Sequence, residues 1–169
     1  MRYLHQLLLI FFIYLISINF SNSKETAFID IDFIIANSNI GKKVLLSINK
    51  LDKENIENLK KKNKSLQELE ITIKNKKNII SDDAFKKEVA SFQAKVKKFK
   101  EEKNKMVKNF NEVKRKELEN VFKKISPIIN DYMEENSVSV LLDSKNIFMG
   151  TKKSNLTKDI LDRINKEIK

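Results

Sequence analysis

The clearest pattern in the chain is a heptad repeat of apolar positions between Phe85 and Phe110. The steps alternate between four and three residues, and only Lys103 breaks the rhythm. The repeat consists of Phe85, Val89, Phe92, Val96, Phe99, Met106 and Phe110. Such spacing is typical of a helix that packs lengthwise against another helix. We therefore predict a long helix with a narrow apolar seam in this region.

A second, weaker seam precedes the first. Its main positions are separated by seven residues or by a multiple of seven: Leu45, Leu59, Leu66, Ile73 and Ile80. Ile48 and Leu69 occupy the companion position, and Asp52, Lys62 and Lys76 interrupt the pattern. Because the other positions are mostly lysine, glutamate, asparagine and aspartate, the two helices cannot build a wide core. This pattern favours an elongated arm made of two helices.

The two seams predict an antiparallel helical hairpin over residues 39–135. Ser38 offers a capping hydroxyl and Gly41 a permissive position at the start of a helix that we expect to end at Ile80. Ser81, Asp82 and Asp83 are predicted to form the turn, and the second helix begins at about Ala84. Helices joined by so short a turn run antiparallel.

The single proline, Pro127, lies within the second helical pattern. It removes a backbone donor and crowds the preceding turn, so we expect a kink near Lys123 to Ser126 and continuation of the helix to about Glu135.

The segments on either side of the hairpin have strand periodicity. Ala27 to Ile35 reads as a strand with Ile29, Ile31 and Phe33 on one face. Val138 to Leu142 reads as a second strand and Ile147 to Met149 as a third, with a turn at 143–146. After a polar loop at 151–155, Thr157 or Asn155 is expected to cap a closing helix. The buried face of this helix is predicted to be Ile160, Leu161, Ile164 and Ile168.

The first strand must pair with the later strands across the whole hairpin. The predicted fold is therefore mainly α, with a strand-rich base formed by residues 24–38 and 136–169. Three strands and a short helix are too small to bury themselves well, and small folds usually depend on metals, disulfides or oligomerisation. Without cysteine or a metal site, oligomerisation through the strands remains. The residues that we assign to the oligomer base are Ile29, Ile31, Val138, Val140 and Leu142.

The N-terminus has the pattern of a signal peptide. Leu7 to Ile16 is an unbroken apolar run, and Ser21 and Ser23 supply small residues at the positions that a signal peptidase reads. We expect removal of residues 1–23, which leaves one domain over 24–169. The alternative is an uncleaved membrane anchor, because extension of the run through Phe20 brings it near the roughly 20 residues of a spanning helix.

The mature chain is strongly basic and has no cysteine. Removing residues 1–23 subtracts only Arg2, so 33 basic and 23 acidic residues leave a net charge of +10. The absence of cysteine excludes disulfides and thiol chemistry. One interpretation of the lysine excess is a solvated helix surface; the other is a positive field that recruits anionic partners. On the second interpretation we assign client binding to Lys97, Lys98, Lys114, Arg115 and Lys116.

The sequence favours a binding protein over an enzyme, and we expect no cofactor and no metal. The lone histidine, His5, lies in the segment expected to be removed. Gly41 and Lys42 resemble the end of a phosphate-binding loop, but Ala36 and Lys43 stand where that motif requires glycine and serine or threonine. Asp30 and Asp32 are better explained by capping or solvent exposure than by acid–base catalysis. Because the chain is exported, we expect no nucleic-acid partner.

Motifs at both ends of the chain resemble those of the Skp/OmpH family of periplasmic chaperones. The family's opening strand carries an aspartate and leads to serine and then Gly-Lys at a helix start; Asp30, Ser38, Gly41 and Lys42 occupy those positions. Near the other end, Val140-Leu141-Leu142-Asp143-Ser144 is similar to the family's Val-Leu-Asp strand. Asn155-Leu156-Thr157, followed by Ile160, is similar to its helix cap, with Asn155 replacing aspartate.

The resemblance implies a homotrimer whose strands join in a small base from which three helical arms project. It implies a periplasmic holdase that works without ATP and keeps unfolded outer-membrane proteins from aggregating. It carries over no catalytic residues. An anionic lipid or lipopolysaccharide is a further candidate partner, although the family's basic site cannot be matched here residue by residue. The alternative from a different functional class is a structural coiled coil, tethered to the membrane by an uncleaved first helix.

Overall fold

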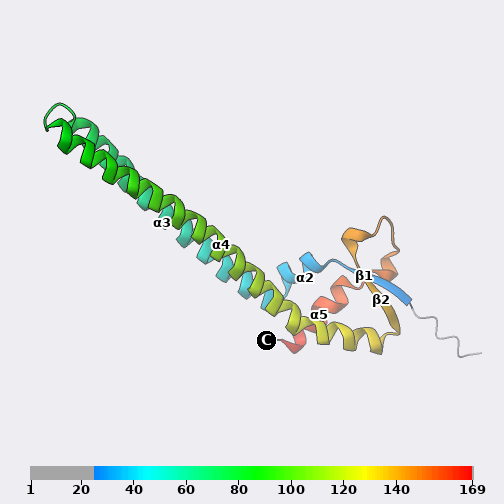
Figure 1. The fold of residues 1–169 in the computed structure, drawn as a ribbon. Helices are drawn as coiled ribbons and strands as arrows, with labels where there is room; N and C mark the ends of the chain where they lie inside the picture. Colours follow the sequence, from blue (N-terminus) through cyan, green and yellow to red (C-terminus); the bar gives the residue numbers. More distant parts are fainter. Residues whose placement is uncertain (1–24, 169) are drawn as a thin grey trace, which may run out of the picture. The chain divides into compact units, whose positions relative to one another are not determined.

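The computed structural model describes residues 25–168, which divide into two compact units. One unit contains residues 25–34 and Ser126–Glu167, and the other contains Ile35–Ile125 together with Ile168. The predicted signal peptide lies outside the described residues. The elements are mostly helical with one pair of strands near the two ends of the chain, so the predicted fold class is confirmed (Figure 1).

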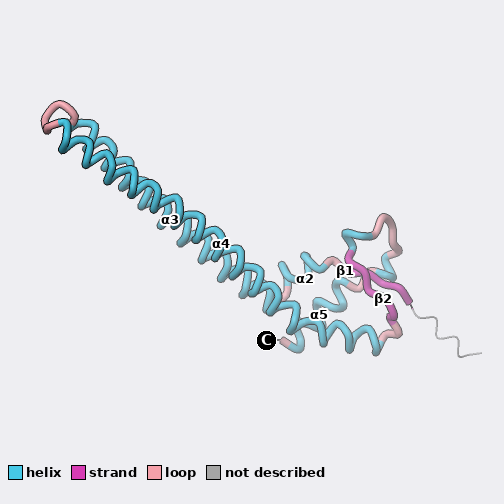
Figure 2. Tube along the Cα trace, viewed as in Figure 1, coloured by secondary structure: helices cyan, strands magenta, loops and turns pink. Residues whose placement is uncertain are grey.

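The unit formed by Ile35–Ile125 consists mainly of two long helices. Helix α3 covers Asn39–Lys76, and α4 covers Asp82–Glu135, so α4 also extends into the other unit. Figures 1 and 2 show the two helices side by side and joined by one turn. The antiparallel hairpin predicted from the heptad pattern is therefore confirmed.

The boundaries of the hairpin turn differ from the prediction by a few residues. Helix α3 ends at Lys76 instead of Ile80, and α4 begins at Asp82 instead of Ala84. Ser81 accounts for the earlier start of α4, because it caps that helix: its Oγ accepts from Ala84 N at 3.4 Å and its carbonyl from Phe85 N at 2.9 Å. Helix α4 continues through Pro127 to Glu135, as expected; the kink stays a prediction.

The start of α3 depends on a close backbone approach. Ser38 is fully buried, and its Oγ accepts a hydrogen bond from Gly41 N at 3.1 Å, which confirms the predicted cap. A Cβ at Gly41 would lie only 1.8 Å from the carbonyl oxygen of Ile35. Position 41 therefore requires glycine because the chain that enters the helix passes directly over it.

The predicted strand from Ala27 to Ile35 is wrong over most of its length. Strand β1 covers Glu25–Ile29, and Ile31–Asn37 forms the short helix α2. The isoleucines at positions 31, 34 and 35 also fit a helical period, and the structure buries the latter two. Asp30 fixes the change of conformation, because its Oδ1 accepts from Phe33 N at 2.9 Å and so caps α2. Phe33, predicted to share a strand face with Ile29, is 48% exposed, whereas Ile29 is buried.

Strand β2 covers Val138–Asp143 and pairs in parallel with β1. The aligned pairs include Thr26 with Val140 and Phe28 with Leu142. Pairing across the whole hairpin, as predicted, is therefore confirmed. The end of α4 leads into β2 through Ser137, which has a positive φ of 56°.

The predicted third strand at 147–149 is not formed. A 3₁₀ helix, η1, covers Ser144–Asn146, and residues 147–151 are an irregular segment. A strand forms only when it pairs with a neighbouring strand. Residues 155–156 take the place beside β1: Leu156 N donates to the carbonyl of Phe28 at 2.9 Å. The loop predicted at 151–155 contains a second 3₁₀ helix, η2, at Lys152–Ser154.

The closing helix α5 covers Thr157–Glu167. Its predicted inner face is confirmed for Ile160, Leu161 and Ile164, which are at most 9% exposed, whereas Ile168 lies after the helix and is half-buried. Asn155 Oδ1 accepts from Thr157 N at 3.1 Å, and Thr157 Oγ1 accepts from Asp30 N at 2.8 Å. These bonds join the start of α5 to the end of β1.

Candidate functional site

The helical hairpin keeps a narrow apolar seam along its length. The side chains of the α4 heptad from Phe85 to Phe110 are all half-buried, and the positions between them are mostly exposed. On α3 the deepest seam positions are Ile48 and Ile73, which are 5% and 7% exposed. A seam of one residue's width buries less apolar surface than a globular core, so the arm retains partly exposed apolar side chains throughout.

Two ion pairs connect the helices and agree with a single register. Lys62 Nζ lies 2.5 Å from Glu102 Oε2, and Lys76 Nζ lies 2.8 Å from Glu88 Oε1. The residue numbers in each pair add up to the same value, as expected for an antiparallel pair without slippage. Both lysines are seam interruptions recognised in the sequence, and each is offset by a glutamate from the facing helix. The hydrogen bond from Lys62 holds the pKa of Glu102 below its usual value.

Between Lys62 and the N-terminal end of α3, the seam opens into a groove. This groove has a volume of about 470 Å³ and is lined by both helices. The residues of α4 supply its apolar wall, and α3 contributes Leu51 and polar side chains. The lining consists of Leu51, Asn55, Lys62, Glu102, Lys105, Met106, Asn109, Phe110 and Val113. We call this set the seam groove.

The groove lies where polar side chains of α3 flank the apolar heptad of α4. Helix α4 continues its heptad with Met106, Phe110 and Val113, while α3 contributes Asn55 and Lys62 beside Leu51. Met106 and Phe110 are half-buried, like the rest of the α4 heptad, and Val113 is 40% exposed. The interruptions at Asp52 and Lys62 were recognised in the sequence, but Asn55 and Asn109 were not. The signal that was missed is an asparagine at Asn55, on the same heptad position as Ile48 and Leu69.

The five basic residues assigned to client binding are all exposed on α4. They form two groups, Lys97 with Lys98 and Lys114 to Lys116, whose nearest members are 16 residues apart. At about 1.5 Å per residue, the groups lie on the order of 24 Å apart along the helix. Arg115 pairs with Glu119 at 2.6 Å, which offsets part of its charge. The five residues therefore form two basic clusters and not one compact site, and further lysines of α4 continue the positive charge between them: Lys100, Lys103, Lys105 and Lys108.

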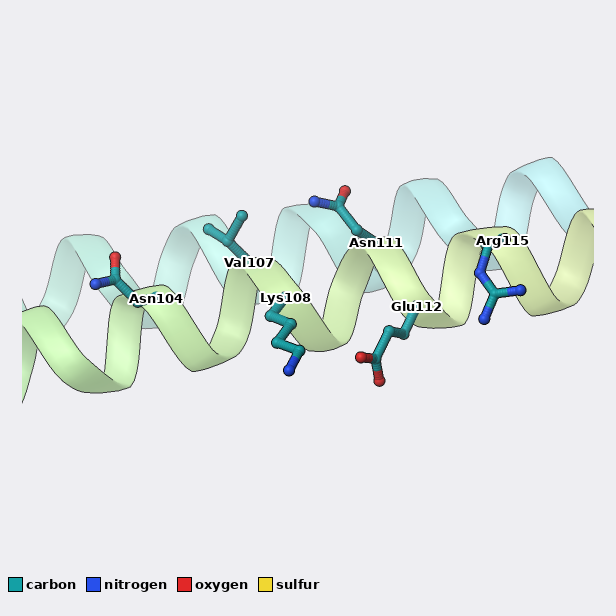
Figure 3. A pocket seen from close by; sticks show the side chains of 6 residues that line it. All are labelled: Asn104, Val107, Lys108, Asn111, Glu112 and Arg115. Carbon is teal, nitrogen blue, oxygen red and sulfur yellow. The ribbon is translucent and has the colours of Figure 1, made fainter.

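A shallow depression of about 520 Å³ lies on α4 beside the second basic cluster. It is lined by Asn104, Val107, Lys108, Asn111, Glu112 and Arg115, all from one helix. Figure 3 shows Val107 and Asn111 pointing to one side of the helix, and Lys108 and Glu112 to the other. Side chains that diverge in this way do not converge on a ligand, so we assign no site to this depression.

The positive charge of the chain belongs to one of the two units. Residues 35–125 carry 25 basic and 13 acidic side chains, a net charge of +12. The described residues of the other unit carry 6 basic and 10 acidic side chains, a net charge of −4. The basic excess is therefore a property of the helical hairpin alone, and the long-range field that it creates originates there.

The strand pair of the other unit has an exposed apolar face. Ala27 and Ile29 are buried at 5% and 6%, so the opposite face of the sheet carries Phe28, Val140 and Leu142. Val140 and Leu142 are 45% and 41% exposed. On the irregular segment, Phe148 and Met149 are 100% and 83% exposed. That segment passes close to Phe28, because a Cβ at Gly150 would lie 2.5 Å from Phe28 Cε1.

The residues assigned to the oligomer base therefore fall into three groups. Ile29 and Val138, at 6% and 9% exposure, are buried within their own chain. Ile31 lies in α2 and not in a strand, so its assignment as a strand residue is wrong. Val140 and Leu142 present apolar surface on the outer face of the sheet. A two-stranded sheet is marginal in water unless its faces and edges are covered.

Ion pairs hold the polar loops of this unit in place. Lys145 pairs with Asp32 of α2, and this hydrogen bond raises the pKa of Lys145. Arg163 of α5 bridges Glu135, at the end of α4, and Glu167; these bonds raise the pKa of the guanidinium. Asp32 is thus engaged in an ion pair, and Asp30 in helix capping. Both aspartates have structural partners, consistent with the capping role preferred for them in the sequence.

Within residues 25–168, no three histidine, cysteine, aspartate or glutamate side chains gather closely enough to hold a metal ion. None of the helices in the same range combines the length and apolar composition that crossing a membrane requires.

Comparison with known proteins connects these features to a family. The sequence model of the family described as "Outer membrane protein (OmpH-like)" matches residues 25–164. Among solved structures, the chain is similar to a candidate outer membrane chaperone (OmpH-like) from Caulobacter crescentus CB15. The identity is 19% over 85% of each chain, with a TM-score of 0.76, so this likeness concerns the fold. No curated protein matches the chain.

Proposed function

This chain belongs to the OmpH-like outer membrane protein family, and we propose that it is a periplasmic holdase chaperone that binds unfolded outer-membrane proteins without ATP. The observation that carries the proposal is the helical hairpin of residues 35–125. It combines a net charge of +12 with a partly exposed apolar seam. Many weak contacts of both kinds suit a protein that must hold chains of differing sequence.

The holding step is binding and not catalysis. The positive field of the hairpin raises the rate at which acidic, unfolded chains encounter it. Apolar contacts then keep the client bound, because burying apolar surface is favourable whatever its order in the client. Lys97, Lys98, Lys114, Arg115 and Lys116 belong to the first step. Anionic lipids and lipopolysaccharide share the charge that this field attracts, and they remain further proposed partners.

We also propose that three copies assemble through the strand-rich unit. The outer face of the sheet, with Val140 and Leu142 partly exposed, and the exposed Phe148 and Met149 supply apolar surface that assembly would cover. The two-stranded sheet by itself leaves edges that a further copy can pair with. Export to the periplasm follows from the predicted signal peptide over residues 1–23.

Two measurements test this function together. The first is the mass of the mature protein in solution, which should correspond to a trimer. The second is light scattering of an outer-membrane barrel protein diluted from urea, which the chaperone should suppress without ATP at about one trimer per client. Undiminished aggregation at a severalfold excess of trimer would overturn the holdase, and an intact N-terminus in the membrane fraction would favour the tethered coiled coil.

A further inference from the structure

We propose that the seam groove is a binding site for an extended client segment with alternating apolar side chains, such as an unfolded strand of an outer-membrane barrel. The inference rests on the proposed holdase function and locates one client contact on the arm. It starts from the lining of the groove, in which Met106, Phe110 and Val113 form an apolar wall and α3 contributes the polar Asn55 and Lys62.

The dimensions of the groove match an extended peptide. Its lining residues run from Leu51 to Lys62 on α3 and from Glu102 to Val113 on α4. Eleven helical steps at about 1.5 Å each give a length of roughly 16 Å. An extended chain advances about 3.3 Å per residue, so the groove accommodates about five residues.

The spacing of the apolar wall matches the period of a strand. Met106 and Phe110 are four residues apart on α4, which is about 6 Å along the helix. Alternate side chains on one face of a strand are about 6.6 Å apart. A client segment with apolar residues at every second position can therefore place successive side chains along this wall. The segment's polar side chains then face solvent.

Two carboxamides at the groove can bind the client's backbone. Asn55 and Asn109 come from opposite helices, and neither side chain hydrogen-bonds to another residue within the described part of the chain. A carboxamide both donates and accepts, so it can pair with a peptide group whatever the client's sequence. A lipid acyl chain offers these amides no hydrogen-bonding group, which makes a polypeptide the better match.

The charge at the groove favours clients with an acidic residue. Lys62 is paired with Glu102, so these two charges offset each other. Lys105 is exposed and lines the same groove. Lys105 adds to the positive charge near Glu102 but makes no ion pair within residues 25–168, so its ammonium group can bind a carboxylate at the end of the bound segment.

The site can be tested on the mature chain with short peptides. The probe is a nine-residue peptide of alternating valine and threonine with one glutamate and a terminal tryptophan. The comparison peptide has the same composition with its valines grouped at one end. We expect the alternating peptide to bind at least fivefold more tightly. Equal affinities would reduce the groove to a nonspecific apolar surface and overturn the proposal.

Location is tested by fluorescence quenching. The chain has neither cysteine nor tryptophan, so a single cysteine introduced as Lys105→Cys can be labelled with bimane, which the peptide's tryptophan quenches on contact. We expect quenching at position 105 and none for Lys108→Cys on the outer side of α4. Equal quenching at both positions, or none at 105 with the peptide bound, places the site elsewhere.

Two substitutions test the chemistry. Asn109→Ala removes one carboxamide and should weaken the alternating peptide about fivefold, while the matched variant Asn104→Ala, outside the groove, should not. Asn55→Leu should fill the interrupted seam, raise the melting temperature and reduce peptide binding. If these variants change nothing while aggregation of the full client is still suppressed, the groove assignment is wrong and the holdase stands. If suppression is absent in the unmodified protein, the holdase itself fails.

Discussion

Replacing Gly41 by alanine should destabilise the arm, although alanine is normally the better helix former. The new Cβ would lie 1.8 Å from the carbonyl oxygen of Ile35, 2.7 Å from its carbon and 2.8 Å from Ser38 Oγ. Comfortable contacts between such atoms are closer to about 3.5 Å. Because two of the three atoms belong to the backbone, no rotamer change relieves the clash. The chain between α2 and α3 must move.

The magnitude follows from three contributions. Overpacking of this kind costs about 1–3 kcal/mol. Moving Ser38 weakens the cap that it provides to Gly41 N, which is worth about 1 kcal/mol. Alanine is about 1 kcal/mol more favourable than glycine within a helix, and this offsets part of the loss. The net loss is about 2 kcal/mol, a substantial part of the roughly 5–15 kcal/mol that stabilises a domain.

Urea unfolding followed by circular dichroism measures this loss. With a denaturant slope of about 2 kcal/mol/M, the midpoint should fall by about 1 M. Wild type and variant must be compared at one protein concentration, because assembly also contributes to stability. Ser65→Ala, at an exposed position of α3, is the control and should change the midpoint little. A Gly41→Ala midpoint equal to or above that of wild type would refute the close approach.

Four further predictions test the other assignments. Ser137→Gly should stabilise the chain by about 1 kcal/mol in the same urea assay, because Ser137 has a positive φ that glycine adopts without strain; a loss of stability would contradict this. Val140→Asp should yield monomers by light scattering, since a charge buried at an interface costs several kcal/mol, whereas Ser139→Asp at an exposed neighbouring position should keep the trimer; the reverse outcome would exclude the outer sheet face. Deleting residues 59–72 together with 92–105 removes two heptads from each helix in register, and should leave the trimer intact while weakening aggregation suppression. Reversing Lys97, Lys98, Lys114 and Lys116 to glutamate should slow client association in stopped-flow measurements and flatten its salt dependence, with dissociation little changed; an unchanged association rate would make these lysines a solvated surface only.

The helical part of the fold was predictable because its pattern is long and local. The heptad of α4 repeats over seven positions from Phe85 to Phe110, and a single interruption at Lys103 does not obscure it. The capping bond from Ser38 to Gly41 was also readable, since it depends on residues only three apart. Local signals of this kind need no knowledge of the rest of the chain.

The strand region was less predictable because short segments fit two periods. Residues 31–33 alternate as a strand does. Ile31, Ile34 and Ile35 equally mark one face of a helix. The choice is made by the bond from Phe33 N to Asp30 and by the bond from Asp30 N to Thr157, which is 127 residues away. Similarly, Ile147 to Met149 has strand composition, but the described chain offers it no partner. Contacts so distant in sequence leave no trace in a local pattern.

The candidate site shows the same division. The basic residues and their two clusters could be named from the sequence, because Lys98 and Lys114 are 16 residues apart on a predicted helix. The seam groove required the register between α3 and α4, which the pairs of Lys62 with Glu102 and of Lys76 with Glu88 reflect. Without that register, Asn55 is only one more polar residue in a lysine-rich helix.

The polar residues in the α3 seam are not equivalent, and the difference bears on function. Lys62 and Lys76 interrupt the apolar stripe, but each meets a glutamate from α4, so the interruption is offset by an ion pair. Asn55 has no such side-chain partner within residues 25–168, and the apolar residues opposite it stay partly uncovered. A leucine at position 55 would continue the heptad and stabilise the hairpin. Asn55 thus forgoes the stability that leucine would give and leaves the apolar wall beside it open. A residue of this kind is what a trade of stability for binding predicts.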